Sequence, residues 1–362
     1  MRVNETAAPV LAVCGLSGAG KTTLLEAAIA KLVARGLAVA VVKHDAHGFV
    51  VDREGKDSDR LFRAGATVML RGPGEQFERR GASAELSLEA SLARLSADHD
   101  LLLVEGHKQT PLPKLWLESN GETGVPEGVT GVICKLTWNS DRLTELLALI
   151  DEWLPAEWTK RPLYGGLLVG GMSSRMGEAK QMLEFGGRML GQIAADALSR
   201  AVGEDRIVAL GAGKLPDALH EMKRIADAPG LSGPAAALIA AHRWDPAAAW
   251  VVSACDHPWI RGEHVQWLLA QRRPGRWAVI PKQRDGYAST MLALYEPQAL
   301  EALERLTRVE DNASPRALLK MEKCYSPEIP EELADGWKNV NTREEFDAEE
   351  ARLKTHRGED RQ

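Results

Sequence analysis

The chain lacks three features that would have pointed to particular classes of protein. Its four cysteines form no C-x-x-C pair, which argues against a zinc site and a disulfide framework. Its net charge of -6 gives no basic surface of the kind that binds nucleic acid. No apolar run reaches the roughly 18 residues of a spanning helix, and the N-terminus lacks a signal-peptide pattern. We therefore expect reduced thiols, a cytoplasmic location, and neither nucleic acid nor membrane as a partner.

The length of 362 residues is too great for one typical domain and suits two. The sequence LPAEWTKRP at 154–162 interrupts a helical pattern and predicts a boundary there. We expect a first unit at 1–155, a second at 163–350, and a polar, frayed tail at 351–362. The units are not repeats of each other, because their glycine-rich loops differ in spacing and in cation placement.

In both units short apolar runs alternate with helical patterns, which predicts parallel sheets covered by helices on both faces. In the first unit we expect strands at 10–14, 37–42, 67–70, 101–104, 114–117 and 129–133, with helices at 22–34 and 137–153. In the second we expect strands at 163–169, 206–210, 250–254 and 277–281, with helices at 193–201 and 235–242. The fold class expected is α/β, as two three-layer domains.

The glycine-rich loop of the first unit follows its first predicted strand and opens a helix. Its sequence GLSGAGKT matches G-x-x-x-x-G-K-[ST], in which backbone N–H groups wrap phosphate oxygens while the lysine and the hydroxyl serve the terminal phosphates and Mg²⁺. A glycine turn built only for packing is the alternative. The residues expected at this phosphate site are Gly15, Ser17, Gly18, Gly20, Lys21, Thr22 and Thr23.

A second group of polar residues follows the other predicted strands of this unit. Glu105 ends the apolar run at 101–104, and beside Thr22 it would serve Mg²⁺ directly or through water, unless it only starts a solvated turn. His44 and His47 could pair on a metal, although isolated histidines more often bond locally. The segment 55–60 is either a capped helix start or a switch or second-substrate loop.

The loop of the second unit carries paired glycines, Gly170 and Gly171, with Arg175 and Lys180 after them. Such a loop suits a triphosphate, because the glycines allow close backbone approach and the cations neutralise charge on a departing pyrophosphate. Asp256 follows a buried strand expected at 250–254. Its carboxylate would lie at the carboxyl-terminal edge of the sheet, where it could bind Mg²⁺. Incidental surface cations and a turn-capping aspartate are the alternatives. Together these residues predict nucleotidyl transfer.

The first unit resembles a known family over about residues 8–135. The segments that carry the resemblance are GLSGAGKTTLLE, VVKHDAHGF, DREGKDSDRLFRAGA and LLLVEGHKQTPLPK, which look like the molybdopterin-guanine dinucleotide biosynthesis adaptor, MobB. The resemblance implies a P-loop GTP-binding protein that assists cofactor maturation and hydrolyses GTP slowly. A homodimer through this unit is a further expectation. A kinase would need an acceptor site and an arginine-bearing lid, and neither is recognisable.

The second unit resembles the molybdenum cofactor guanylyltransferase, MobA, over about residues 163–348. The motifs are the loop from Leu168 to Lys180, Asp227 ahead of LSGPAAAL, CDHPWI and WKNVNTREEF. The resemblance implies a Rossmann-like nucleotidyltransferase fold, with Mg²⁺ at Asp256 and sites for GTP and for the pterin. GTP would bind Leu168, Gly170, Gly171, Lys180, Asp227 and Asp256, and the pterin would bind Arg316, Asn339 and Asn341.

From the residues alone, Asn339 and Asn341 read as a strand end that caps the next helix, and Arg316 as a helical surface cation. Three departures from the family pattern bear on base selectivity and on the pterin pocket. Ala179 replaces an aspartate, Ser289 stands where proline is common, and the strand end at 210–213 lacks an asparagine.

These observations predict a fusion of the two families. The second unit would transfer GMP from GTP to molybdopterin or its molybdenum form, while the first binds GTP and assists. Expected partners are GTP, the pterin, and possible recipient molybdoenzyme apo-proteins and cofactor insertion proteins. Rival readings are a cytidylyltransferase acting on the same pterin, a sugar-phosphate nucleotidyltransferase, and a GTP-dependent carrier or scaffold without transfer activity.

Overall fold

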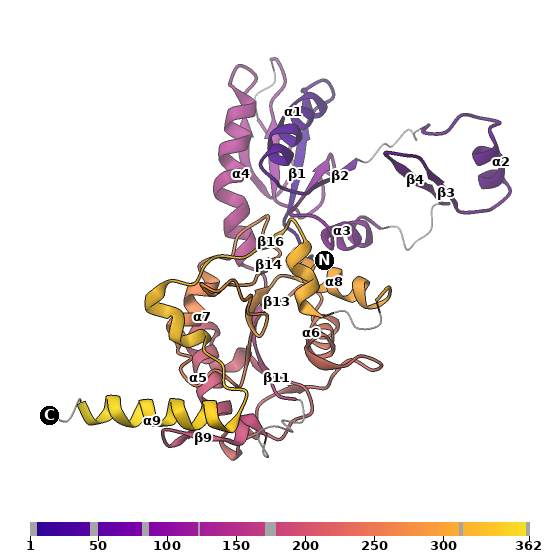
Figure 1. Cartoon of the computed structure of the whole chain (residues 1–362). Helices are drawn as coiled ribbons and strands as arrows, with labels where there is room; N and C mark the ends of the chain where they lie inside the picture. The colour runs from indigo at the N-terminus through magenta and orange to yellow at the C-terminus, as the bar shows by residue number, and fades with distance from the viewer. Residues whose placement is uncertain are drawn as a thin grey trace.

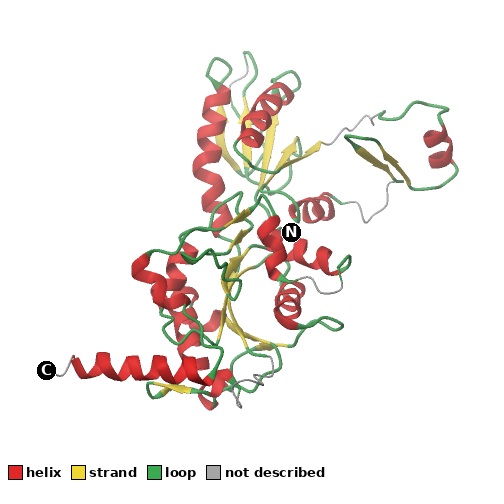
Figure 2. Ribbon diagram, viewed as in Figure 1, coloured by secondary structure: helices red, strands yellow, loops and turns green. Residues whose placement is uncertain are grey.

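The computed structural model describes residues 6–43, 50–81, 87–121, 124–170, 179–310 and 314–359, with side chains up to 355. Each half of the chain is built around its own β-sheet, with helices on both faces of the sheet (Figures 1 and 2). We call residues 6–155 the N-terminal half and residues 163–350 the C-terminal half. The expected α/β class is confirmed in both.

The sheet of the N-terminal half is fully parallel, in the order β2-β5-β1-β6-β7. Because strand side chains alternate between faces, β1 sends Leu11 and Val13 toward one layer of helices and Ala12 and Cys14 toward the other. Helices α1 and α4 cover the first face and α3 the second. The elements are β1 (Val10–Gly15), α1 (Lys21–Ala34), β2 (Val39–Lys43), α3 (Leu88–Ser96), β5 (Leu101–Glu105), β6 (Lys114–Leu117), β7 (Val132–Leu136) and α4 (Arg142–Thr159).

An arm between β2 and α3 projects from this half (Figure 1). It contains α2 (Asp57–Arg63) and an antiparallel hairpin of β3 (Val68–Arg71) and β4 (Gln76–Arg79). The strand predicted at 67–70 therefore exists, but its assignment to the parallel sheet is wrong. Asp59 organises the arm, since it accepts hydrogen bonds from the Gly55 amide and from Arg63 and Arg79. These bonds lower the pKa of Asp59 to about 2.

The sheet of the C-terminal half is mixed, in the order β12-β11-β8-β13-β15-β14-β16. Strands β12, β11, β8 and β13 are parallel, and β15 runs antiparallel to both β13 and β14. Helices α6 and α8 pack on one face, and α5 and α7 on the other. The elements are β8 (Leu163–Leu168), α5 (Leu190–Val202), β11 (Ile207–Leu210), β12 (Arg224–Ile225), α6 (Gly233–Trp244), β13 (Ala249–Ala254), α7 (Gly262–Leu269), β14 (Ala278–Val279), β15 (Leu292–Tyr295), α8 (Pro297–Thr307) and β16 (Cys324–Tyr325). A small hairpin of β9 (Glu184–Phe185) and β10 (Arg188–Met189) precedes α5.

Two predicted irregular segments are helical in the structure. Helix α4 continues to Thr159 through Pro155, so it crosses most of the expected break, and its Trp158 is buried in the core of the C-terminal half. Helix α9 (Arg343–Glu359) likewise covers most of the segment expected as a tail. Burial of Trp158 explains the first difference, because this anchor lies in the other half and has no local signal in the sequence.

The two halves meet in a buried polar interface centred on Asp100, which is fully buried. Its carboxylate accepts a hydrogen bond from the Ala38 amide at 2.7 Å within its own half. From the C-terminal half it accepts bonds from the Gly275 amide at 3.0 Å, Trp277 Nε1 at 2.7 Å and Lys323 Nζ at 2.6 Å. A buried carboxylate is stable only with such partners, so the two halves depend on each other at this point.

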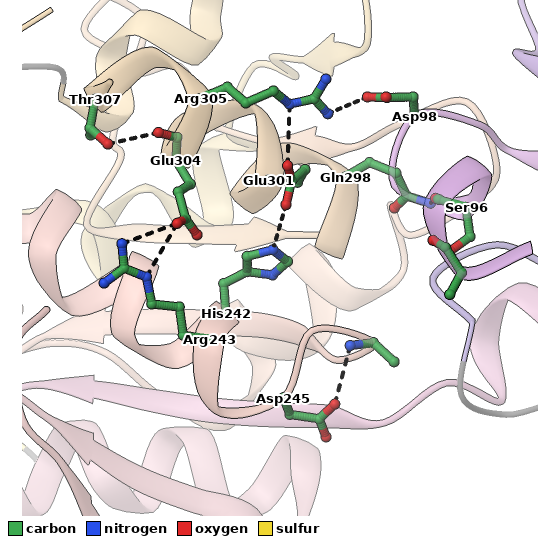
Figure 3. Close-up of polar contacts among 12 residues, drawn as sticks. Ser96, Asp98, His242, Arg243, Asp245, Gln298, Glu301, Glu304, Arg305 and Thr307 are labelled. Atoms are coloured by element: carbon green, nitrogen blue, oxygen red, sulfur yellow. Dashed lines mark hydrogen bonds and ion pairs between the residues drawn. The ribbon is translucent and has the colours of Figure 1, made fainter. Parts of the chain in front are cut away.

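Two further side chains, one from α8 and one just before β8, donate to backbone carbonyls of the N-terminal half. Gln298 Nε2 donates to the Ala7 carbonyl at 2.8 Å and to the His99 carbonyl at 3.1 Å, and the buried Arg161 also donates to the Ala7 carbonyl. At the edge of the interface His242, Glu301, Arg305 and Asp98 form a row of ion pairs (Figure 3).

The same contacts fix the direction of the central strands. Ala7 lies just before β1 and Arg161 just before β8, so both strands begin at the interface and run away from it. The carboxyl ends of β1 and β8 consequently point in opposite directions from the interface.

Candidate functional site

The loop after β1 has the backbone geometry of a phosphate cradle. Gly20 has a φ of 83° directly before α1, in the left-handed region that glycine adopts without strain. A Cβ on Gly15 would lie 2.7 Å from the Leu117 carbonyl oxygen, so this position must also be glycine. The first turn of α1 then directs unpaired N–H groups and the positive end of the helix dipole at the loop.

Polar side chains around this loop come from α1, β2 and β5. Lys21 Nζ donates to the Leu16 carbonyl at 2.8 Å, and burial lowers the pKa of Lys21. Thr22 Oγ1 donates to the Glu105 carboxylate at 3.1 Å, and Lys43 Nζ lies 3.5 Å from the same carboxylate. The structure therefore brings Thr22 and Glu105 together as predicted for a metal on this side. Ser17, Gly18 and Thr23 are exposed around them.

The second site is a cavity of about 420 Å³ at the carboxyl ends of β8, β11 and β13. Every predicted GTP residue of this half that the structure describes lines it, namely Leu168, Gly170, Lys180, Asp227 and Asp256. Partial burial raises the pKa of the Asp227 carboxyl. The predicted residues Gly171 and Arg175 lie outside the described residues, as do His44 and His47 in the other half.

Lys180 is the centre of the polar contacts in this cavity. Its Nζ donates to Asp256 Oδ2 at 3.0 Å and to Asn341 Oδ1 at 2.9 Å. The backbone reinforces this arrangement, since the Val340 amide donates to the Asp256 carbonyl at 2.8 Å. Segments separated by 76 and 161 residues thus meet at one ammonium group. Asn341, predicted to face the pterin, lies beside the residues predicted to act on the nucleotide.

The other carboxylate oxygen of Asp256 fits a cation. Among the described residues, Asp256 Oδ1 is buried without a hydrogen-bond partner, although His257 Nδ1 lies 3.2 Å away. Within the same part of the chain, no group of three or more His, Cys, Asp or Glu side chains could hold a metal. Mg²⁺ needs no such group, because it is commonly held by one or two carboxylates together with substrate phosphates and water. Asp256 and, in the other half, Thr22 with Glu105 meet that requirement.

The remaining predicted pterin residues are less closely joined to Lys180. Asn339 is exposed and precedes the buried Val340. The Arg316 guanidinium lies 5.0 Å from the centre of the Tyr287 ring, and both side chains are exposed. The Asn341 backbone amide donates to the Glu345 carboxylate, and Thr342 Oγ1 accepts from the Glu345 amide. The segment therefore caps α9 as expected from the sequence, but through the Thr342 side chain.

Several cavity residues were not predicted from the sequence. Gly233, Pro234 and Ala237 of α6 line the cavity, so the N-terminus of this helix faces into it. The segment PGLSGP marked this helix start, but not its place in the fold. Gly211 also lines the cavity, and a Cβ there would lie 2.3 Å from the Val169 carbonyl oxygen. Glycine is thus required at the strand end where the sequence lacks the family's asparagine.

Comparison with known proteins assigns the two halves of the chain to two different families. Residues 10–128 match the family model for molybdopterin guanine dinucleotide synthesis protein B, and residues 165–326 match the model for the MobA-like NTP transferase domain. A molybdopterin-guanine dinucleotide biosynthesis adapter protein from Haemophilus influenzae is 35% identical, over 40% of this chain and 89% of that protein. The chain is a MobB family member fused to a MobA-like transferase domain. The predicted fusion is therefore confirmed.

Two further relatives match about half of the fusion. A probable molybdenum cofactor guanylyltransferase from Thermococcus gammatolerans is 27% identical, over 51% of this chain and 97% of that protein. A molybdenum cofactor biosynthesis bifunctional protein from Synechocystis is 27% identical, over 53% of this chain and 54% of that protein. In the described part of the fusion, no helix is both long and apolar enough to cross a membrane.

Proposed function

We propose that the C-terminal half transfers GMP from GTP to molybdopterin, or to its molybdenum form, and releases pyrophosphate. The observation that carries this proposal is the cavity lined by Lys180 and Asp256, with Asn341 bonded to Lys180 beside it, within a MobA-like NTP transferase domain. The nucleotide would lie along Leu168, Gly170 and Asp227, and the pterin would approach from Asn341, Asn339 and Arg316.

The residues divide the work of an in-line displacement at the α-phosphate. Asp256 would hold Mg²⁺, which supplies Lewis-acid stabilisation of the phosphate oxygens when bound. Lys180 would neutralise charge that develops toward the pyrophosphate, and its contacts with Asp256 and Asn341 pre-set its position. Arg175, which lies outside the described residues, would serve the same leaving group. The acceptor phosphate must lie in line with the bond that breaks, and Asn341 stands where it can orient that acceptor.

The N-terminal half would bind a second GTP at the loop from Gly15 to Thr23, with Mg²⁺ at Thr22 and Glu105. Slow hydrolysis at most is expected there, as membership of the MobB family implies. We propose that this half assists the cofactor's passage to recipient apo-proteins and insertion proteins. The cytoplasm remains the predicted location, and fractionation of cells would test it.

A homodimer through the arm of the N-terminal half is the assembly we propose. The arm exposes five large apolar side chains: Val50, Val51, Leu61, Met69 and Leu70. An exposed apolar surface of this kind on a projecting element favours association. Sedimentation of the wild-type protein and of a Leu61→Glu, Met69→Glu variant tests it. A dimer that becomes a monomer supports the proposal, and a wild-type monomer contradicts it.

The transfer reaction is tested with the full-length protein, molybdopterin, Mg²⁺ and either [α-³²P]GTP or [α-³²P]CTP. We expect label to enter the dinucleotide from GTP in preference to CTP. Preference for CTP would make the C-terminal half a cytidylyltransferase. Binding of GTP without any incorporation would favour a carrier or scaffold.

A further inference from the structure

An exposed tryptophan stands beside the phosphate loop of the N-terminal half. Trp138 follows β7, in the short loop that leads into α4, and is 43% exposed. The other exposed tryptophan among the described side chains, Trp244, packs edge-on against Tyr164 and Trp250. Among the ring contacts of the described residues, Trp138 has one with a cation and none with another ring, since the Arg142 guanidinium lies 5.1 Å from its centre.

Arg142 ties this tryptophan to the phosphate loop. Its Nη1 donates to the Ala19 carbonyl at 2.8 Å, inside the loop, and its Nε donates to the Thr137 carbonyl at 2.7 Å, next to Trp138. Its Nη2 donates to the Glu118 carbonyl at the end of β6. One guanidinium group therefore joins the loops that follow β1, β6 and β7. Arg142 is also the first residue of α4, where the helix dipole disfavours a cation, so helix stability does not account for its place.

The sheet order decides on which side the nucleoside must lie. The phosphates belong at the start of α1, and the Thr22–Glu105 pair places the metal toward β5, on one side of β1. Strands β6 and β7 lie on the other side of β1, and Trp138 is two strand spacings away, on the order of 10 Å. The sugar and base of a bound nucleotide can extend over β6 toward that ring.

We propose that Trp138 forms the wall on which the purine base of the P-loop nucleotide packs, and that Arg142 is the positioning residue for this wall. The ligand class is a purine nucleoside di- or triphosphate. The inference rests on the proposed nucleotide binding by the N-terminal half. An aromatic ring is suited to this use, since base stacking on it tolerates any purine and adds to phosphate binding.

The test compares a ligand that has a base with one that lacks it. Binding of Mg²⁺-GTP and of Mg²⁺-tripolyphosphate is measured on the full-length protein by equilibrium dialysis. The part of the total binding that is lost in the Lys21→Ala variant is assigned to the P-loop. Binding that remains in this variant is assigned to the C-terminal cavity. We expect Trp138→Ala to weaken the P-loop part of GTP binding roughly tenfold and to leave tripolyphosphate binding unchanged. Trp138→Phe should restore most of the GTP affinity.

The position of Arg142 is tested by the same ratio of GTP to tripolyphosphate affinity. Arg142→Lys keeps the charge, but one ammonium nitrogen cannot reach the three carbonyls that Arg142 contacts through three separate nitrogens, so the ratio should fall toward that of Trp138→Ala. An unchanged ratio would overturn the positioning role.

Three outcomes would contradict the packing of the purine base on Trp138. Equal losses for GTP and tripolyphosphate in Trp138→Ala would mean a structural role only, and no loss for GTP would mean that the ring does not touch the base. If Lys21→Ala removes no binding of either ligand, the P-loop proposal fails and this inference fails with it. Tryptophan emission gives an independent readout, because GTP should quench a component that is absent from Trp138→Phe.

Discussion

The two halves hold the lysine that we propose contacts a nucleotide's phosphates in different ways. In the MobB half, Lys21 is held by the carbonyl of Leu16, five residues before it, and the loop is complete within one short segment. In the MobA-like half, Lys180 is held by the side chains of Asp256 and Asn341, which come from distant parts of the chain. The first site is local and visible as a motif, whereas the second exists only when the sheet has formed.

The contacts that join the two halves can be removed by a single substitution. Replacing Asp100 by Ala leaves Lys323 and three other donors without their shared acceptor, which should cost about 3–5 kcal/mol of unfolding free energy. The matched variant Asp98→Ala removes a half-exposed ion pair with Arg305 and should cost about 0–1 kcal/mol. Urea unfolding followed by circular dichroism measures both. Equal losses would show that the buried carboxylate does not join the halves.

Removal of the Asp256 carboxylate should affect the reaction of the MobA-like half and not that of the MobB half. Asp256→Asn should lower transfer of GMP on the order of 10²–10³-fold, because a metal-stabilised charge is lost from the transition state. GTP hydrolysis by the MobB half should be unchanged, since the carboxyl ends of β1 and β8 point in opposite directions from the interface. Dinucleotide formation and phosphate release are measured on the same sample. The exposed Asp205→Asn is the control, and a similar loss in it would contradict the role of Asp256.

The reverse change is Lys21→Ala, which removes a charge-assisted contact from the P-loop. GTP binding by the MobB half should weaken about 10- to 100-fold, while transfer by the other half persists. Binding is followed by equilibrium dialysis and transfer by dinucleotide formation. If Lys21→Ala abolishes transfer as well, the two sites are not independent.

A smaller effect is expected on P-loop affinity when pH changes the charge of the same lysine, Lys21. Burial lowers the pKa of Lys21, so its ammonium loses its proton at a lower pH than an ordinary lysine. Only the charged form pairs with phosphate, so P-loop affinity should fall as pH rises toward that lowered pKa. Lys21→Arg stays charged and should show a flatter profile. Identical profiles for the two proteins would contradict the effect of burial.

Local patterns in the sequence predicted most of the framework. The runs that became β1, β5, β8 and β13 carry continuous apolar residues, and both glycine loops follow such a run. The failures have a common physical cause in tertiary contacts. Trp158 extends α4 because it is buried in the other half, and Val68 pairs with Arg79 in a separate hairpin that no periodicity distinguishes from a sheet strand.

The candidate sites divide in the same way. Lys21, Thr22, Asp256 and Lys180 were found from motifs and from their positions at strand ends. The contact of Asn341 with Lys180 spans 161 residues and needs the finished fold. The place of Trp138 and Arg142 beside the P-loop likewise depends on the order of β1, β6 and β7 in the sheet.

The most direct measurement of the central claim uses GTP labelled at either the α- or the γ-phosphate, with molybdopterin and Mg²⁺. The account predicts that the α-label enters the dinucleotide while an equal amount of γ-label leaves as pyrophosphate. The Asp256→Asn variant should form neither labelled dinucleotide nor pyrophosphate. Its N-terminal half should still release inorganic phosphate slowly. Wild-type protein that releases γ-label only as inorganic phosphate, with no α-label in a dinucleotide, would contradict the account.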